Sequence, residues 1–223
     1  MYGVGPSFMM NPIALLSDLM TWLLHALYPL CGPFGYGLAI IFLTIIVKIA
    51  LFPLTLSSTK QMAAMQKLQP KLDALREKLK EKPQELQQEI MKLYKTEGVN
   101  PFGGCLPMLL QIPFFLALFF TLKNPKFIEL LNQPGVHGAF LWIPTLAKPD
   151  PLHVLVVLIA VTTYMSQKSM GVTSPQQKQM TYFMPAFIAL VSLPFPAGVQ
   201  LYWVVSNLLT VLQQMYILRG RKA

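Results

Sequence analysis

Long apolar segments alternate with polar ones along the chain of 223 residues. Apolar runs of about 18 residues predict membrane-spanning helices, because each helical residue advances about 1.5 Å through a hydrocarbon core of roughly 30 Å. The pattern predicts five spans, at residues 36–56, 105–122, 152–170, 180–193 and 198–218. The fourth is short, and a short span is accommodated by bilayer thinning or by oligomerisation. We therefore predict an all-α, polytopic membrane protein with a five-transmembrane-helix core.

Residues 1–35 predict a different kind of helix. Leucines recur at helical spacing in NPIALLSDLMTWLLHALYPLC, beside a thin polar stripe of Ser17, Asp18, Thr21 and His25. This pattern predicts an external amphipathic helix at the membrane interface, with a first transmembrane helix as the alternative. Residues 1–35 lack Lys and Arg, so the charged start of a secretory signal peptide is absent. Either the first span directs targeting, or an upstream portion has been cut away.

The large polar segment, residues 57–100, predicts a helical hairpin. Leu68, Leu72, Leu75 and Leu79 have heptad-like spacing, and after EKPQ the spacing resumes at Leu86, Ile90 and Leu93. Two antiparallel helices would bury these rows against each other. The other faces carry nine bases and six acids. The hairpin is either a solvated link between two spans or a docking arm for acidic lipid, ribosomal RNA or another cytoplasmic partner.

The distribution of Lys and Arg predicts the orientation, since loops on the cytoplasmic side carry the excess. Residues 57–100 hold nine of the 18, and others lie beside the predicted loop 171–179 and in the tail 219–223. The predicted external loop, 123–151, has only three. We expect an external N-terminus and a cytoplasmic C-terminus. The net charge of +9 is therefore interpreted as a topology signal and does not indicate DNA binding.

One lysine interrupts the first predicted span. Lys48 lies in IIFLTIIVKIALFPL, where a lysine at the helix centre costs about 2.5 to 3.5 kcal/mol. It lies eight residues from the cytoplasmic end of the span, about 12 Å of helix rise, which is too far for full snorkelling. None of the five spans contains Asp or Glu. The pattern favours a water-filled cavity between helices, and simple interhelical hydrogen bonding is the alternative.

Polar residues on other spans provide a lining for such a cavity. Thr44, Lys48 and Thr55 are predicted to share a face of the first span, Gln111 lies in the second, and Thr163, Ser166 and Gln167 share a face of the third. The fifth span carries a stripe at spacings of three and four residues. Its members are Gln200, Trp203, Asn207, Thr210 and Gln214.

Four longer strings carry further information: TIIVKIALFPLT in the first span, LQPKLDALREKLK in the hairpin, MKLYKTEGVNPFGGCLPMLLQIPFFLALFF into the second span, and FPAGVQLYWVVSNLLTVLQQ in the fifth. Through these strings the chain resembles the YidC/Oxa/Alb family of membrane protein insertases over about residues 10–220. NPFGGCLP and the five-span core are typical of bacterial members. The resemblance implies a multi-pass protein of the bacterial inner membrane.

The resemblance also implies a hydrophilic groove that opens to the cytoplasm and to lipid and is closed on the outer side. The positive residue of the groove corresponds to Lys48, although the family usually has arginine there. Lysine, unlike arginine, can lose its proton when buried, so its charge is less permanent. The substrate-contacting positions of the family correspond to Thr44 and Trp203, and Gln111 and Asn207 match further polar positions. The outer faces of the second and fourth spans resemble the surface along which a substrate helix slides.

These observations predict an insertase and folding chaperone for nascent membrane proteins, working in the lipid bilayer without nucleotide hydrolysis. Its candidate partners are the ribosome and the Sec translocon, through the hairpin and the tail. The alternatives are a small solute or ion transporter or channel with Lys48 as its site, and a purely structural assembly subunit. We expect no enzymatic activity: SSTK at residues 57–60 lacks the companion motifs of serine acyl-enzymes, there is no Walker-type loop, and the three histidines lack metal-ligand spacing. No cofactor or metal is expected.

Overall fold

The computed structural model describes residues 12–100, 106–170 and 175–219. The predicted tail 219–223 and the first part of the predicted loop 171–179 therefore lie almost wholly outside the described residues. The described residues form nine α-helices and no β-strand, so the predicted all-α class is confirmed. The α-helices are α1 Pro12–Leu27, α2 Gly35–Ala50, α3 Phe52–Lys78, α4 Pro83–Thr96, α5 Leu106–Lys123, α6 Pro125–Leu131, α7 Val154–Met170, α8 Pro175–Ser192 and α9 Ala197–Arg219. The short 3₁₀ helices η2 (Tyr28–Leu30) and η3 (Gly32–Phe34) join α1 to α2.

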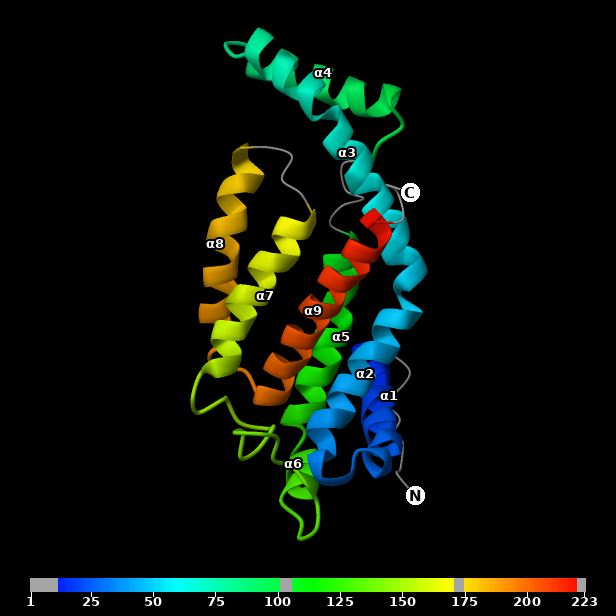
Figure 1. Cartoon of the computed structure of the whole chain (residues 1–223), viewed down its shortest axis with the longest axis vertical. Coiled ribbons are helices and arrows are strands. Elements are labelled where there is room, and N and C mark those ends of the chain that lie inside the picture. Colours follow the sequence, from blue (N-terminus) through cyan, green and yellow to red (C-terminus); the bar gives the residue numbers. More distant parts are fainter. Residues whose placement is uncertain (1–11, 101–105, 171–174, 220–223) are drawn as a thin grey trace.

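Five helices, α2, α5, α7, α8 and α9, form an elongated bundle (Figure 1). Helix α9 packs against α7, α2 and α5, while α8 packs against α7. Helices α3 and α4 extend from one end of the bundle, and α6 and the loops around it lie at the opposite end (Figure 1). We call these the hairpin end and the α6 end. Because α9 contacts four other helices, α3 among them, it is the element that brings polar residues from distant parts of the chain together.

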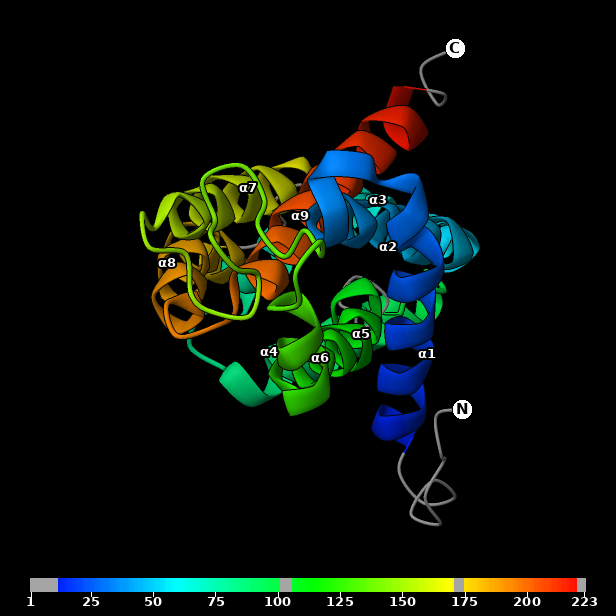
Figure 2. The ribbon, with the colours of Figure 1, turned by 90° about the horizontal axis from the view of Figure 1, so that it is seen from below.

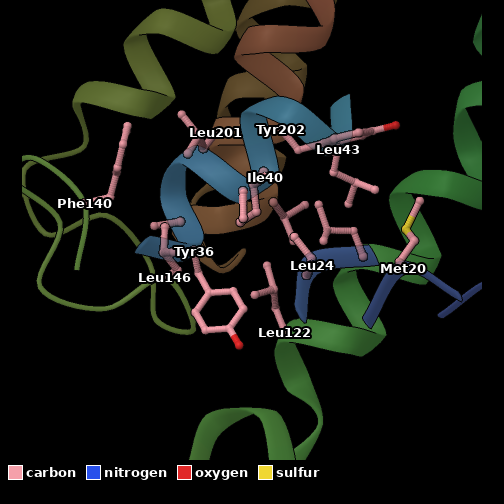
Figure 3. Close-up of a cluster of buried hydrophobic side chains, with 14 of the residues drawn as sticks. Met20, Leu24, Tyr36, Ile40, Leu43, Leu122, Phe140, Leu146, Leu201 and Tyr202 are labelled. Carbon is pink, nitrogen blue, oxygen red and sulfur yellow. The ribbon is translucent and has the colours of Figure 1, made fainter. Parts of the chain in front are cut away.

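The apolar core lies where α1, α2, α5 and α9 meet. Leu24, Ile40, Leu43 and Leu122 are fully buried there. Figure 3 shows these side chains beside Tyr202 of α9. Burial of a leucine or isoleucine side chain contributes about 1.5 to 3 kcal/mol in water. This cluster fixes α2, which carries Lys48, against α9, which carries the predicted polar stripe of the fifth span.

Two helical segments of the described residues are long and apolar enough to cross a membrane, residues Pro12–Leu30 and Gly32–Ala50. Three shorter apolar helices cover Leu109–Lys123, Val154–Ser169 and Gln179–Ser192. These are close to the second, third and fourth predicted spans. Helix α8 begins at Pro175, five residues before the predicted start of the fourth span. The five membrane crossings stay a prediction.

The first predicted span, 36–56, is not one continuous helix. Helix α2 ends at Ala50 and α3 begins at Phe52. Pro53 cannot donate the backbone hydrogen bond that would continue α2, which explains the break. Thr55 therefore belongs to α3, where its hydroxyl donates to the Leu51 carbonyl at 3.0 Å. The expectation that Thr55 extends the face of Thr44 and Lys48 on a single helix is wrong.

Three members of the polar stripe of α1, Ser17, Thr21 and His25, face other helices of the protein, whereas Asp18 is exposed. The Ser17 hydroxyl lies 3.0 Å from that of Thr121 on α5, and His25 Nδ1 lies 2.8 Å from the Tyr36 hydroxyl on α2. The exposed face of α1 is mainly apolar, with Trp22 64% accessible, and includes Asp18. Figure 2, which looks from the α6 end, shows α1 along its length at the edge of the bundle. The position of α1 relative to the membrane stays a prediction.

The connection between α5 and α7 is fastened to the α6 end of the bundle. The Tyr36 amide donates to the His137 carbonyl at 3.2 Å, and the Ala197 amide at the start of α9 donates to the Lys148 carbonyl at 2.8 Å. Gly35 has a φ of 49°, and a side chain there would overlap the His137 carbonyl. These contacts fasten the start of α2 and the start of α9 to the same connecting segment.

Candidate functional site

Lys48 lies in the last turn of α2, near the break before α3. Its side chain is half-buried, and its Nζ donates a 2.9 Å hydrogen bond to the Thr210 hydroxyl on α9. Thr210 donates its own proton to the Ser206 carbonyl at 2.8 Å, so its oxygen is free to accept from Lys48. The structure therefore brings together two predicted site residues that are 162 positions apart.

The Lys48 ammonium has no carboxylate partner among the described residues. The ion pairs among the described residues lie within residues 71–97, in and beside the hairpin. A lysine ammonium has three donor hydrogens, and Thr210 accepts one of them. The half-buried side chain thus keeps donor capacity for water or for an incoming anion. A positive charge in this state attracts a carboxylate more strongly than a fully solvated one does, because screening is weaker.

The stripe on α9 connects this helix to α7. The Asn207 amide donates to the Thr163 hydroxyl at 2.9 Å and lies 3.3 Å from that of Thr162. Two helical turns further along α9, the Gln214 side-chain carbonyl accepts from the Ser169 hydroxyl. All of these α7 partners are polar residues on the face that meets α9. The pairing of α7 with α9 is therefore polar as well as apolar.

A second group of contacts connects α9 to α5. The Gln111 amide donates to the hydroxyl of Tyr202, which is buried. Trp203, half-buried, meets the ring of Phe115 edge to face at a centroid distance of 5.1 Å. Aromatic pairs in this geometry contribute about 0.5 to 1.5 kcal/mol beyond their burial. Trp203 and Gln111 thus lie on the α5 side of α9, and Asn207 and Gln214 lie on its α7 side.

Two predicted site residues make other contacts. Thr44 is fully buried, and its hydroxyl donates at 2.6 Å to the Ile40 carbonyl of its own helix. Gln200 donates to the Ser192 carbonyl at 2.8 Å, and its buried Oε1 has no hydrogen-bond partner among the described residues. Neither side chain contacts Lys48 through a hydrogen bond. The structure thus joins Lys48 to Thr210 and distributes the other predicted residues over separate contacts.

These contacts are the interhelical hydrogen bonding that the sequence left open as the alternative to a solvated cavity. Buried polar side chains of membrane helices are commonly satisfied in this way. Interhelical hydrogen bonding is compatible with hydration of Lys48, because the half-buried ammonium keeps unused donor hydrogens. Among the described residues, no group of three or more His, Cys, Asp or Glu side chains is placed to hold a metal ion. The roles of the predicted residues in substrate binding stay a prediction.

Comparison with known proteins places the chain in a family. A family model described as "60Kd inner membrane protein" matches residues 26–223. The chain belongs to this family. The resemblance seen in the sequence is thereby confirmed, and the match includes helices α2 to α9 and only the last two residues of α1.

Relatives of this 60Kd inner membrane protein family carry the name "Membrane protein insertase YidC". The protein from Buchnera aphidicola subsp. Baizongia pistaciae is 42% identical over 207 residues, which are 92% of this chain and 37% of that protein. The protein from Mannheimia succiniciproducens is 43% identical, over 89% of this chain and 36% of the relative. The protein from Legionella pneumophila strain Corby is 40% identical, over 92% of this chain and 35% of the relative. The chain thus spans about a third of the length of these relatives.

A solved structure of the family has the same fold. It is described as "Active YidC insertase crystal structure with the first transmembrane domain resolved". The likeness has a TM-score of 0.73 at 26% sequence identity, and it covers 93% of this chain and 47% of that one. The helical membrane-protein fold that the sequence predicts agrees with this neighbour.

Sequence reasoning missed several polar residues of this family member's bundle, among them Ser169, which donates to Gln214. Gln213 donates from its amide to the Lys48 backbone carbonyl at 3.4 Å, next to the Lys48–Thr210 contact. Tyr202 and Thr162 accept from Gln111 and Asn207. Gln213 is adjacent to the predicted Gln214, but it lies off the helical face that defined the stripe. Tyr202 stands in an apolar and aromatic run, and only the need of Gln111 for a partner could have indicated it.

Proposed function

We propose that the chain forms the core of a membrane protein insertase and folding chaperone, in which a hydrophilic groove centred on Lys48 receives polar segments of nascent proteins. The name that the relatives carry supports the insertase class. The observation that carries the proposal is the state of the Lys48 ammonium. It is half-buried between apolar segments, bonded to Thr210, and without a carboxylate partner among the described residues.

In this proposal, Lys48 attracts an acidic residue on the incoming segment. Desolvation of an isolated carboxylate opposes its entry into lipid, and a nearby ammonium offsets part of that cost while the segment is part-way in. A groove that reaches into the bilayer shortens the path through hydrocarbon. The apolar helix of the substrate then enters lipid and provides about 25 cal/mol per Å² of buried apolar surface. The step needs no nucleotide hydrolysis.

Trp203 and Thr44 are proposed to contact the substrate, and Gln111, Gln200, Asn207, Thr210 and Gln214 to contribute polar surface. We further propose the orientation predicted from Lys and Arg, with the N-terminus outside and the hairpin end in the cytoplasm of a bacterial inner membrane. Nascent chains, lipid, the ribosome and the Sec translocon are the proposed partners. The half-buried state of Trp203 beside Phe115 supports a contact role, since an aromatic side chain there is accessible without leaving its packing.

The test is insertion into liposomes that contain the purified chain. The substrate is a single-span protein with a short acidic translocated tail, scored by the fragment protected from protease. We expect Lys48→Glu to lower insertion about tenfold, equivalent to about 1.4 kcal/mol, and Lys48→Arg to preserve it. Lys123→Glu is the matched control, because it reverses an exposed lysine at the end of α5. A substrate whose tail acids are changed to amides should be insensitive to Lys48→Glu.

Full insertion of the acidic substrate by the Lys48→Glu variant would contradict the proposal. The same liposomes, loaded with a small anionic dye, separate the alternative class. Dye release that depends on Lys48, without substrate insertion, would indicate a transporter or channel. Insertion without release supports the insertase.

A further inference from the structure

The leucine rows of the hairpin are only partly closed. Leu68 and Leu72 on α3 are buried, at 5% and 1% exposure, as the heptad spacing predicts. Further along α3, Leu75 is only half-buried, and so is Leu93 on α4. Helix α4 has no buried residue. The two helices therefore stay in contact without completing an apolar core.

A cleft of about 440 Å³ lies between α3 and α4 at the level of Leu75 and Leu93. Together with Ala74, these residues form an apolar floor. Lysines line the same cleft from both helices: Lys71 and Lys78 on α3, and Lys92 on α4. The cleft thus combines an apolar floor with a basic rim.

The rim is held by weak, exchangeable contacts. Glu89, the acidic residue of the lining, pairs with Lys92 at 3.4 Å, and Lys71 pairs with Glu97. Both pairs are solvent-exposed, and exposed ion pairs contribute only about 0 to 1 kcal/mol. Lys78 has no ion-pair partner among the residues that the structure covers. An incoming acidic group therefore meets little competition.

We propose that this cleft binds an acidic amphipathic helix of a partner protein. The groove between two antiparallel helices accepts the apolar ridge of a third helix, as in other helix-in-groove complexes. Leucines of the guest would complete the half-buried row at Leu75 and Leu93. Glutamates flanking its apolar ridge would face Lys71, Lys78 and Lys92. Charge complementarity of this kind sets the specificity and the association rate.

The shape and chemistry of the cleft distinguish this guest from others. Several lining residues, including Ala74 and Lys78, are exposed, so the cleft is too open to enclose a small molecule as ligand pockets do. A bilayer surface is flat and would not enter a concave space between helices. Nucleic-acid phosphates need the lysines but gain nothing from an apolar floor. An acidic helix uses both features.

The position of the hairpin fits a docking role. The end of α3 and the whole of α4 extend beyond the ends of α7, α8 and α9 (Figure 1). This docking surface goes beyond the insertion step proposed for Lys48. Because it is distant from the bundle core, its test is independent of insertion activity.

The test measures binding of labelled peptides to the purified full chain in nanodiscs by fluorescence anisotropy. The probe is a peptide of about 18 residues, long enough to form a helix, with Leu at i, i+3, i+4 and i+7 and Glu beside them. A scrambled peptide of equal composition lacks the apolar ridge. We expect saturable binding of the probe that weakens with salt, and at least tenfold weaker binding of the scrambled peptide.

Two variants test the cleft. Lys78→Glu should weaken binding about fivefold by reversing a rim charge, and Ala74→Trp should weaken it about tenfold by filling the cleft without changing charge. Lys95→Glu is the matched control, since this exposed α4 lysine lies outside the lining. Equal loss in Lys78→Glu and Lys95→Glu, or equal binding of the scrambled peptide, would mean that charge alone attracts the probe and would overturn the proposal. So would tight binding of a short duplex RNA that Ala74→Trp abolishes.

Discussion

Lys48 and Thr210 join the end of α2 to α9 through a single hydrogen bond of 2.9 Å from the ammonium to the hydroxyl. Thr210→Val removes the acceptor with little change in shape. We expect a loss of about 1 kcal/mol in the free energy of unfolding, because the half-buried ammonium can turn toward water. A double-mutant cycle with Lys48→Met, read from unfolding in mixed micelles, should give a coupling energy of similar size. Additive effects would show that the contact contributes nothing to stability.

The Gln111–Tyr202 contact is the corresponding link between α5 and α9, and it is more deeply buried. Tyr202→Phe keeps the ring and removes the acceptor of the Gln111 amide. An unsatisfied buried donor costs about 1 to 3 kcal/mol, so we expect a measurable fall in the thermal unfolding midpoint. Tyr216→Phe is the matched control on the same helix, because Tyr216 is 74% exposed. Equal midpoints for both variants would contradict the structure at this position.

Much of the arrangement is predictable from the sequence where a local pattern determines it. The apolar runs predict the helices, and the three- and four-residue spacing on α9 predicts a polar stripe, one member of which, Thr210, accepts from Lys48. The pattern does not say which helix each member meets. Asn207 pairs with α7 and Trp203 packs on α5, because these partners are set by the position of α9 between its neighbouring helices.

Two other expectations show the limit of periodicity. The polar stripe of α1 is present, but Ser17 and His25 use it to contact α5 and α2. A stripe indicates only that polar groups share a face, and either water or a neighbouring helix can satisfy them. In the hairpin, the heptad spacing correctly predicts burial of Leu72, while Leu75 stays half-buried. The angle between two helices depends on tertiary contacts that the spacing does not contain.

The buried carboxylate of Asp150 organises the start of α7. It accepts from the Trp142 indole at 3.1 Å, from the Leu152 amide at 3.1 Å and from the Leu155 amide at 2.8 Å. Asp150→Ala would leave these donors without their acceptor, and we expect a loss of about 2 to 4 kcal/mol in the free energy of unfolding.

Asp150→Asn should lower the free energy of unfolding less than Asp150→Ala does, since the amide oxygen of asparagine still accepts a hydrogen bond. Glu129→Gln on α6 is the control, because Glu129 is exposed and also lies at the α6 end. Unfolding monitored by Trp fluorescence measures all three variants. An Asp150→Ala chain as stable as the control would exclude a structural role for this carboxylate.

Gly37 tests the packing of α2 against the loop that follows α6. In a helix interior, Gly→Ala usually stabilises by about 0.5 to 1 kcal/mol. At Gly37 the added methyl would overlap the ring of Phe140, which is itself 8% exposed. We therefore expect the opposite sign, a loss of about 1 to 3 kcal/mol in the free energy of unfolding. Phe140→Ala should relieve the overlap, so the double variant should be more stable than the sum of the two single changes predicts, whereas simple additivity would contradict the contact.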